Sequence, residues 1–170
     1  MAFHHLAIAS RDIKATHEFY TAAMGFTLVK IAVGPTGEQG FAKHLFYDTG
    51  NGELMAFWDL HDPGLPDDWS PAIATALGLP IWTNHIAFAA SDRADLDAKR
   101  ERWVDRGHDV TEIDHGWCTS IYTTDPNGIL VEFCQTTADF ADPEEALRIL
   151  GDPAPALDPE PPMLHYPGRR

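Results

Sequence analysis

Alternating apolar and polar positions, broken by stretches of helical spacing, predict two successive groups of strands and helices. In the first group, one strand precedes a helix that begins after Asp12 and ends at Gly25, and three strands follow; the strands are expected at 3–9, about 26–33, 42–48 and 53–59. The second group repeats this order, with a helix at about 93–106 and strands at 82–90, 108–113, 118–124 and 129–135. Each group is therefore predicted to be a β-α-β-β-β module.

An internal repeat connects the two groups. Residues 5–13 read HLAIASRDI and residues 85–93 read HIAFAASDR, and a second pair of similar segments reads NGELMAFW at 51–58 and NGILVEFC at 127–134. The first pair is 80 residues apart and the second pair 76, in the same order along the chain. Two matches at nearly equal spacing indicate tandem modules of one fold. Strands combined with one helix per module indicate an α+β protein.

Changes in composition divide the chain further. We expect a two-module domain at 1–135, with modules at 1–60 and 81–135. The linker between them, 61–80, is rich in Pro, Gly and Asp, and a single helical turn is the regular structure expected in it. A C-terminal extension follows at 136–170.

The extension is predicted to hold one helix and a proline-rich tail. Asp142 and Pro143 suit the start of a helix and Gly151 suits its end. Residues 152–170 hold six of the 13 prolines of the chain, so they are not expected to form regular structure with a core of their own. This tail is expected to be extended, packed on a surface or disordered.

The composition restricts the partners of the chain. Its 170 residues contain 12 Lys and Arg against 26 Asp and Glu; the resulting net charge of −14 makes binding to nucleic acid or to an anionic membrane unexpected. The start MAFHHLAIASRD lacks the pattern of a secretory signal, and no apolar run approaches the roughly 18 residues that span a bilayer. Cys118 and Cys134 are too few for a disulfide framework and are expected to be small core residues on strands. We therefore expect a cytoplasmic protein.

Three side chains are candidate metal ligands. His5 and His85 occupy the same position at the start of equivalent strands in the repeat, and Glu132 lies in the middle of the last strand of the second module. A carboxylate in a strand is costly to bury unless it is paired or bound to a metal. If a pseudo-twofold axis relates the modules, these two imidazoles and the carboxylate converge in a facial triad, which suits Fe(II), with Mn(II) and Zn(II) as alternatives.

The repeated segments, together with SIYTTDPNGILVEF at 120–133, resemble the vicinal oxygen chelate superfamily over residues 3–135. That superfamily includes glyoxalase I, extradiol ring-cleaving dioxygenases, thiol transferases that inactivate fosfomycin, and bleomycin-binding proteins. The resemblance implies that the two modules form a cupped mixed sheet around a divalent metal, with ligands at His5, His85 and Glu132. It also implies a substrate that chelates the metal through vicinal oxygens, so that the metal stabilises an anionic intermediate.

Departures from the family patterns bear on the choice among these activities. Ala56 stands where glyoxalase I usually has a fourth ligand, which favours the three-ligand sites of the extradiol dioxygenases and the fosfomycin enzymes. Tyr122 matches the tyrosine of the extradiol pattern that hydrogen-bonds the ring hydroxyl. The histidine acid/base of the ring-cleaving enzymes is missing, because Asn51 and Gly52 occupy its place. The histidines that could reach the site instead are His44, His61 and His115.

The sequence thus favours an extradiol-type dioxygenase with Fe(II), or with Mn(II), Zn(II) or Ni(II) as alternatives, that acts on a small catecholic substrate. Tyr122 would orient the diol, and His115 or His44 would transfer a proton. Aromatic residues that could stack on the substrate, or that simply pack the sheets, are Trp58, Trp82, Trp117, Phe46, Phe57 and Tyr47.

Two other classes stay open at this point. One is a glyoxalase-like isomerase, lyase or thiol transferase on the same metal site, and the other is a protein that only binds a small molecule. The cup could close within one chain or between the two copies of a homodimer.

Overall fold

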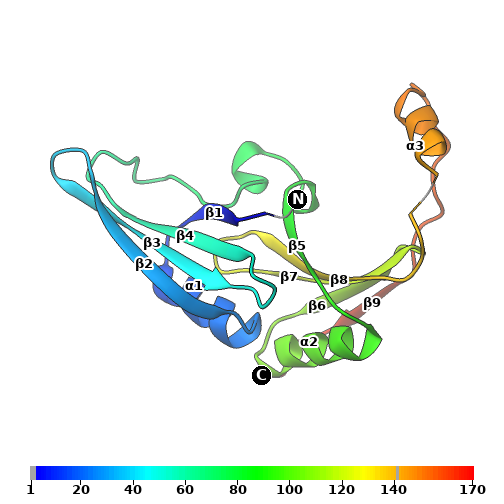
Figure 1. Ribbon diagram of the computed structural model, residues 1–170, viewed down its shortest axis with the longest axis horizontal. Helices are drawn as coiled ribbons and strands as arrows, with labels where there is room; N and C mark the ends of the chain where they lie inside the picture. Colours follow the sequence, from blue (N-terminus) through cyan, green and yellow to red (C-terminus); the bar gives the residue numbers. More distant parts are fainter. Residues whose placement is uncertain (1–2, 141) are drawn as a thin grey trace. The chain divides into compact units, whose positions relative to one another are not determined.

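The first module has the predicted β-α-β-β-β order. The computed structural model describes residues 3–140 and 142–170. The elements of the first module are β1 (His5–Ser10), α1 (Ile13–Glu18), β2 (Thr27–Thr36), β3 (Gly40–Asp48) and β4 (Leu54–His61). Its four strands form one sheet in the order β1-β4-β3-β2 (Figure 1), in which β1 is parallel to β4 and the other neighbours are antiparallel.

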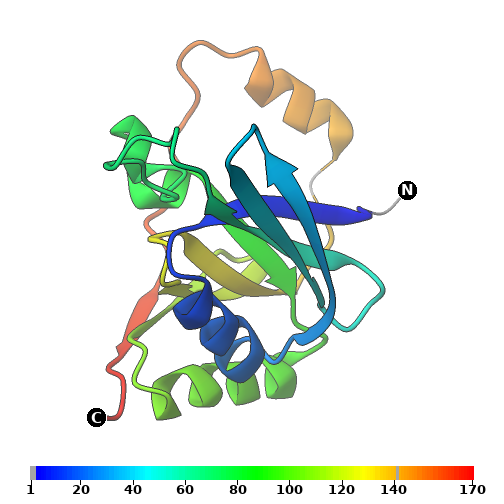
Figure 2. The ribbon, with the colours of Figure 1, turned by 90° about the vertical axis from the view of Figure 1, so that its left-hand side faces the viewer.

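The second module repeats this order. Its elements are β5 (His85–Ala89), α2 (Arg93–Asp105), β6 (Val110–Asp114), β7 (Cys118–Thr124) and β8 (Leu130–Thr136), followed by α3 (Pro143–Leu150) and β9 (Met163–Tyr166). The strands form a second sheet in the order β5-β8-β7-β6-β9 (Figure 2). The α+β class and the two β-α-β-β-β modules are therefore confirmed.

The α-helices α1, α2 and α3 each begin after an aspartate whose side chain accepts a hydrogen bond from a backbone N–H of the first turn. These aspartates are Asp12 for α1, Asp92 for α2 and Asp142 for α3. The first helix is predicted as one α-helix that ends at Gly25. In the structure α1 ends at Glu18, and the chain then forms a π-helical turn over Phe19–Ala23. In the described part of the chain, no helix combines the length and the apolar content that crossing a membrane requires.

The described residues up to Ile86, together with Thr124–Val131, form one compact unit. Tyr20, from the π-helical turn, is fully buried, and its ring centroid lies 4.4 Å from that of Phe57 in β4. Apolar side chains of the sheet thus pack on the helical segment, and burial of these large rings stabilises the unit.

The turn between β7 and β8 is part of the core of this first unit. Asp125, 4% exposed, accepts a hydrogen bond from the hydroxyl of Tyr20 at 3.1 Å and bonds from the backbone N–H groups of Asn127 and Ile129 at 2.9 Å each. Asn127, also buried, donates to the hydroxyl of Thr16 at 3.1 Å. Buried polar groups need such partners, so this network holds the turn in one position.

The remaining described residues form the second unit. Trp103 of α2 is fully buried, and its ring centroid lies 5.2 Å from that of Phe133 in β8. Glu112 of β6, 6% exposed, accepts bonds from Arg93 at 2.7 Å and from Arg100 at 2.8 Å. The helix is therefore attached to its sheet by an aromatic contact and by two ion pairs to a buried carboxylate.

Of the forms expected for residues 152–170, the end of the tail adopts the extended one and pairs with a sheet. Met163–Tyr166 form β9, which pairs antiparallel with β6. Just beyond β9, the N–H of Gly168 donates to Asp109 at 2.9 Å. The four residues of β9 contain no proline, and β6 would otherwise be an uncovered edge of the sheet. Proline content correctly predicted the irregular stretch before β9 but carries no information on where an edge strand needs a partner.

Candidate active site

Four ring-bearing side chains gather on the face of the first sheet that points away from α1. Tyr47 and Phe57 pack toward the helical segment, so the alternate positions of β3 and β4 point to the other face. The rings on that face are those of His5 from β1, His44 and Phe46 from β3, and Trp58 from β4.

These rings form a continuous series. His44 stacks on Trp58 with ring centroids 3.8 Å apart and planes 11° apart, because the two residues are direct neighbours across β3 and β4. Phe46 lies 4.1 Å from His44, and His5 lies 5.5 Å from Phe46 and 6.0 Å from His44. Burial, and secondly the nearby His5, lower the pKa of His44, so this ring is neutral at pH 7.

Both histidines predicted to bind a metal begin a strand and have a hydrogen bond at Nδ1. Nδ1 of His85 lies 2.9 Å from the carbonyl oxygen of Trp82, so Nδ1–H donates to this oxygen. Nδ1 of His5 lies 2.8 Å from Nδ1 of His4, and one of the two rings donates. A carbonyl acceptor at Nδ1 is usual for a histidine that binds a metal through Nε2, so His85 suits its predicted role.

In the second unit, the hydroxyl of Tyr122 lies near two other predicted site residues, His115 and Glu132. Its hydroxyl oxygen lies 3.1 Å from Nε2 of His115. Glu132, 5% exposed in β8, is also within hydrogen-bonding reach of this hydroxyl. Burial, reinforced by the carboxylate of Glu132, raises the pKa of Tyr122 above its ordinary value, so the phenol keeps its proton at neutral pH. The three side chains thus form a polar series of carboxylate, phenol and imidazole.

The two cysteines lie on β7 and β8 as predicted and are free, Cys118 buried and Cys134 half-buried. The sulfur of Cys118 lies 3.8 Å from the hydroxyl of Ser120. Burial raises the pKa of Cys134 to about 11. A protonated thiol is a poor nucleophile, so Cys134 is not suited to nucleophilic catalysis.

His61, the third histidine that could have supplied a proton, lies elsewhere. Its Nε2 is 2.9 Å from a carboxylate oxygen of Asp59, which also accepts a bond from Lys43 at 2.9 Å, and its ring stacks on Phe41 with centroids 4.3 Å apart. Asp59 and His61 alternate with Trp58 along β4 and therefore point to the opposite face of the sheet. His61 is thus part of an ion-pair cluster and not of the ring series.

Among residues 3–140 and 142–170, no three His, Cys, Asp or Glu side chains lie close enough together to hold a metal ion. The triad of His5, His85 and Glu132 therefore stays a prediction. The chemistry of its donors fits a divalent metal, since it combines two imidazoles, one with its tautomer set by a carbonyl, and one buried carboxylate. Ala56 is fully buried in β4, and its methyl group offers no ligand atom.

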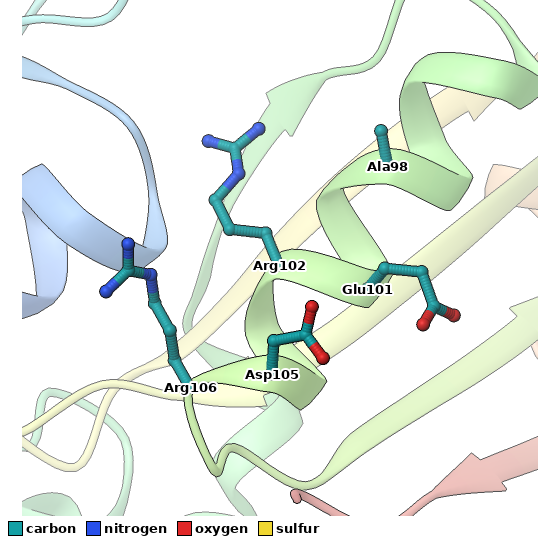
Figure 3. Close-up of a pocket in the computed structure, with 5 residues that line it drawn as sticks. All are labelled: Ala98, Glu101, Arg102, Asp105 and Arg106. Carbon is teal, nitrogen blue, oxygen red and sulfur yellow. The ribbon is translucent and has the colours of Figure 1, made fainter.

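A surface hollow beside α2 is lined mainly by charged side chains. It is lined by Ala98, Glu101, Arg102, Asp105 and Arg106 (Figure 3). The two arginines extend to one side of the helix, while Glu101 and Asp105 form ion pairs with Arg169 of the C-terminal segment. None of the predicted site residues lines this hollow.

Solved structures resemble the chain at low sequence identity. A lactoylglutathione lyase from Agrobacterium tumefaciens is 20% identical, with a TM-score of 0.53 over 79% of this chain and 92% of that one. The fosfomycin resistance protein FosX from Listeria monocytogenes is 18% identical, with a TM-score of 0.54 over 81% and 94%. TnmS3, an antibiotic-binding protein from Streptomyces sp. CB03234, is 17% identical, with a TM-score of 0.55 over 81% and 97%. These likenesses concern the fold alone.

Sequence comparison identifies the family more directly. No curated protein sequence matches the chain. A sequence model of the Glyoxalase/Bleomycin resistance protein/Dioxygenase superfamily, however, matches residues 2–133, which include both modules up to the middle of β8. The chain therefore belongs to the glyoxalase/bleomycin resistance protein/dioxygenase superfamily.

Proposed function

We propose that the chain is a metal-dependent extradiol-type dioxygenase that opens the ring of a catechol, with Fe(II) as the favoured metal. His5, His85 and Glu132 would bind the metal. The proposal rests mainly on Tyr122, whose hydroxyl lies 3.1 Å from Nε2 of His115 and within reach of Glu132. A neutral phenol and an imidazole next to a predicted ligand are suited to hold a substrate oxygen and to move its proton.

The roles of the two side chains follow from their protonation. When bound, the divalent metal would supply a Lewis acid for the two vicinal oxygens of the diol. Tyr122 keeps its proton at neutral pH and donates a hydrogen bond to a substrate oxygen, which orients the diol. His115, in contact with this hydroxyl, takes up the proton that the diol releases and returns it to the ring-opened product. The net reaction consumes one O2 per diol, and both oxygen atoms enter the product.

The proposal is tested by loading the purified chain with Fe(II) under anaerobic conditions and adding a panel of catechols and then air. We expect a yellow ring-opened product and uptake of one O2 per diol consumed. Parallel samples with Mn(II), Zn(II) and Ni(II) test the alternative metals. Turnover of a hemithioacetal or an epoxide without O2 uptake, and no product from any diol, would contradict the proposal and support isomerase, lyase or thiol-transfer chemistry.

Replacing Tyr122 by phenylalanine is expected to lower kcat for catechol by about 100-fold, which is the size of the loss when a substrate is no longer held in its reactive orientation. The bound metal should remain, because Tyr122 is not a predicted ligand. Tyr166→Phe in β9 is the matched control, since this ring packs against Arg100 at the far edge of the same sheet. A kcat for Tyr122→Phe within twofold of the unaltered protein would remove Tyr122 from the mechanism.

Binding without chemistry is a second candidate function, and the ring series on the first sheet favours it. Trp58 is 37% exposed, so part of its indole is available to a flat ligand. Metal analysis separates the two functions. A protein that purifies without stoichiometric metal, and whose affinity for an aromatic ligand is unchanged by His85→Ala, would be a binding protein.

A further inference from the structure

The ring series on the first sheet contains an indole with one covered and one uncovered side. Trp58 lies between two strands, opposite His44 of β3 and opposite Ala9 of β1. Directly opposite residues of neighbouring strands point to the same face of a sheet. On the β3 side, His44 stacks on the indole at 3.8 Å. On the β1 side the neighbour is only a methyl group, which agrees with the 37% exposure of Trp58.

The uncovered side of the indole is on the same sheet face as a predicted metal ligand. His5 and Ala9 both lie on β1, at alternate positions that share one face. His5 lies 6.0 Å from His44, which in turn lies 3.8 Å from Trp58. His5 pairs with Leu54 of β4, and Trp58 follows four residues later on that strand, which separates the two backbone positions by about 13 Å at roughly 3.3 Å per residue. A diol with a second ring beyond the one held at His5 covers more of this distance than catechol does.

His44 is placed for stacking and not for hydrogen bonding. Among the described residues, its Nε2 is one of few buried side-chain nitrogen or oxygen atoms with no hydrogen-bond partner. A buried polar atom without a hydrogen-bond partner lowers the stability of a protein, and such atoms are found mostly at functional sites. The ring instead fills the space between Trp58 and Phe46, with Phe46 at 4.1 Å. This packing holds the indole in one orientation.

We propose that Trp58, oriented by His44, stacks on a second aromatic ring of the substrate, so that the preferred diols are bicyclic catechols and not catechol itself. This inference rests on the proposed function for the placement of the diol near His5. Trp58 is then the residue that determines specificity, and His44 is a positioning residue. The polar part of the substrate binds toward His5 and its apolar ring lies over Ala9 against the indole.

The test compares naphthalene-2,3-diol with catechol in two assays on the full chain. The first is calorimetric binding to the metal-free protein, and the second is the KM and kcat of the Fe(II)-loaded protein. We expect the unaltered protein to prefer the bicyclic diol by about 10-fold in both Kd and KM, which is the size of one aromatic stacking contact. Trp58→Ala should reduce this preference to less than about twofold, because the bicyclic diol loses its stacking contact and its Kd and KM rise toward those of catechol.

Three further variants identify which side chain causes a change in the preference for the bicyclic diol. Trp82→Ala removes a different exposed indole, 66% accessible, and should keep the full preference. His44→Phe should keep it as well, because a phenyl ring can stack on Trp58, whereas His44→Ala should weaken it through KM and not through kcat. Circular dichroism confirms that each variant is folded.

The outcomes separate this inference from the proposed function. Equal affinity of the unaltered protein for both diols, or a preference that survives Trp58→Ala, overturns the role of Trp58 even if the enzyme cleaves catechol. A preference that depends on Trp58 in the metal-free protein, combined with no cleavage of any diol, supports the stacking site and overturns the dioxygenase.

Discussion

Replacing His85 by alanine is expected to abolish stoichiometric Fe(II) binding and to reduce diol cleavage by more than about 100-fold. Loss of a group that merely orients a ligand costs 10–100-fold in metal affinity, so loss of a ligand itself should cost at least as much. Glu132→Gln should have the same effect, because an amide is a weak ligand and brings no negative charge. Bound iron is measured by elemental analysis after gel filtration, and cleavage by the yellow product.

Two control variants make this result specific. His165→Ala alters an exposed histidine of β9 that contacts Thr111 on the neighbouring strand, and it should bind iron normally. Trp82→Phe keeps the backbone carbonyl that accepts from Nδ1 of His85, and it should also bind normally. Stoichiometric iron in His85→Ala or Glu132→Gln would exclude that residue from the triad.

Replacing Asp125 by alanine is expected to lower the free energy of unfolding by about 3 kcal/mol or more. Its buried carboxylate accepts bonds from Tyr20 and from the N–H groups of Asn127 and Ile129, and each buried donor left without a partner costs about 1–3 kcal/mol. The matched control is Asp48→Ala in the corresponding turn of the first module. Asp48 is half-buried, and its side chain accepts from the N–H of Gly50, so its loss should cost about 1 kcal/mol or less.

Urea unfolding measures the loss of stability in Asp125→Ala and in Asp48→Ala. The pH dependence of this loss tests whether the carboxyl group of Asp125 causes it. Burial raises the pKa of Asp125, although hydrogen bonds from Ile129, Asn127 and Tyr20 oppose this. A raised pKa in the folded state means that the stability due to Asp125 is fully present below the unfolded pKa of about 3.9, and that it declines as pH rises through the folded pKa. The difference between the unaltered protein and Asp125→Ala should therefore grow as pH is lowered from 7 toward 4. Equal losses of unfolding free energy for Asp125→Ala and Asp48→Ala would show that the buried network around Asp125 contributes nothing to stability.

The positions of the candidate site residues were predictable in part, and for identifiable reasons. The repeat placed His5 and His85 at the start of equivalent strands, and both lie there, because a strand that begins a module is specified by its own alternation. Glu132 lies within β8, as its pattern predicted, and it is buried. The contact between Tyr122 and His115 had no sequence signal, since His115 precedes β7 in a loop whose path depends on the neighbouring strand.

Three features had no counterpart in local sequence patterns. The π-helical turn after α1 places Tyr20 where its hydroxyl meets Asp125, which is 105 residues away. The edge of β6 determines that Met163–Tyr166 become a strand, although the surrounding prolines favour irregular structure. The stack of His44 on Trp58 depends on the register of β3 and β4. Register and edges are properties of a pair of strands, so one strand alone does not reveal them.

The sequence by itself determined the fold class, the two modules and the order of their elements, because periodicity, helix caps and turns act within a few residues and repeat in both halves. Tertiary structure decided which rings of the first sheet share one face, where the Asp125 turn packs and which side of Trp58 stays uncovered. These depend on contacts between residues far apart in the chain. Such contacts form only when the sheets assemble, and the energy of each depends on all of its neighbours.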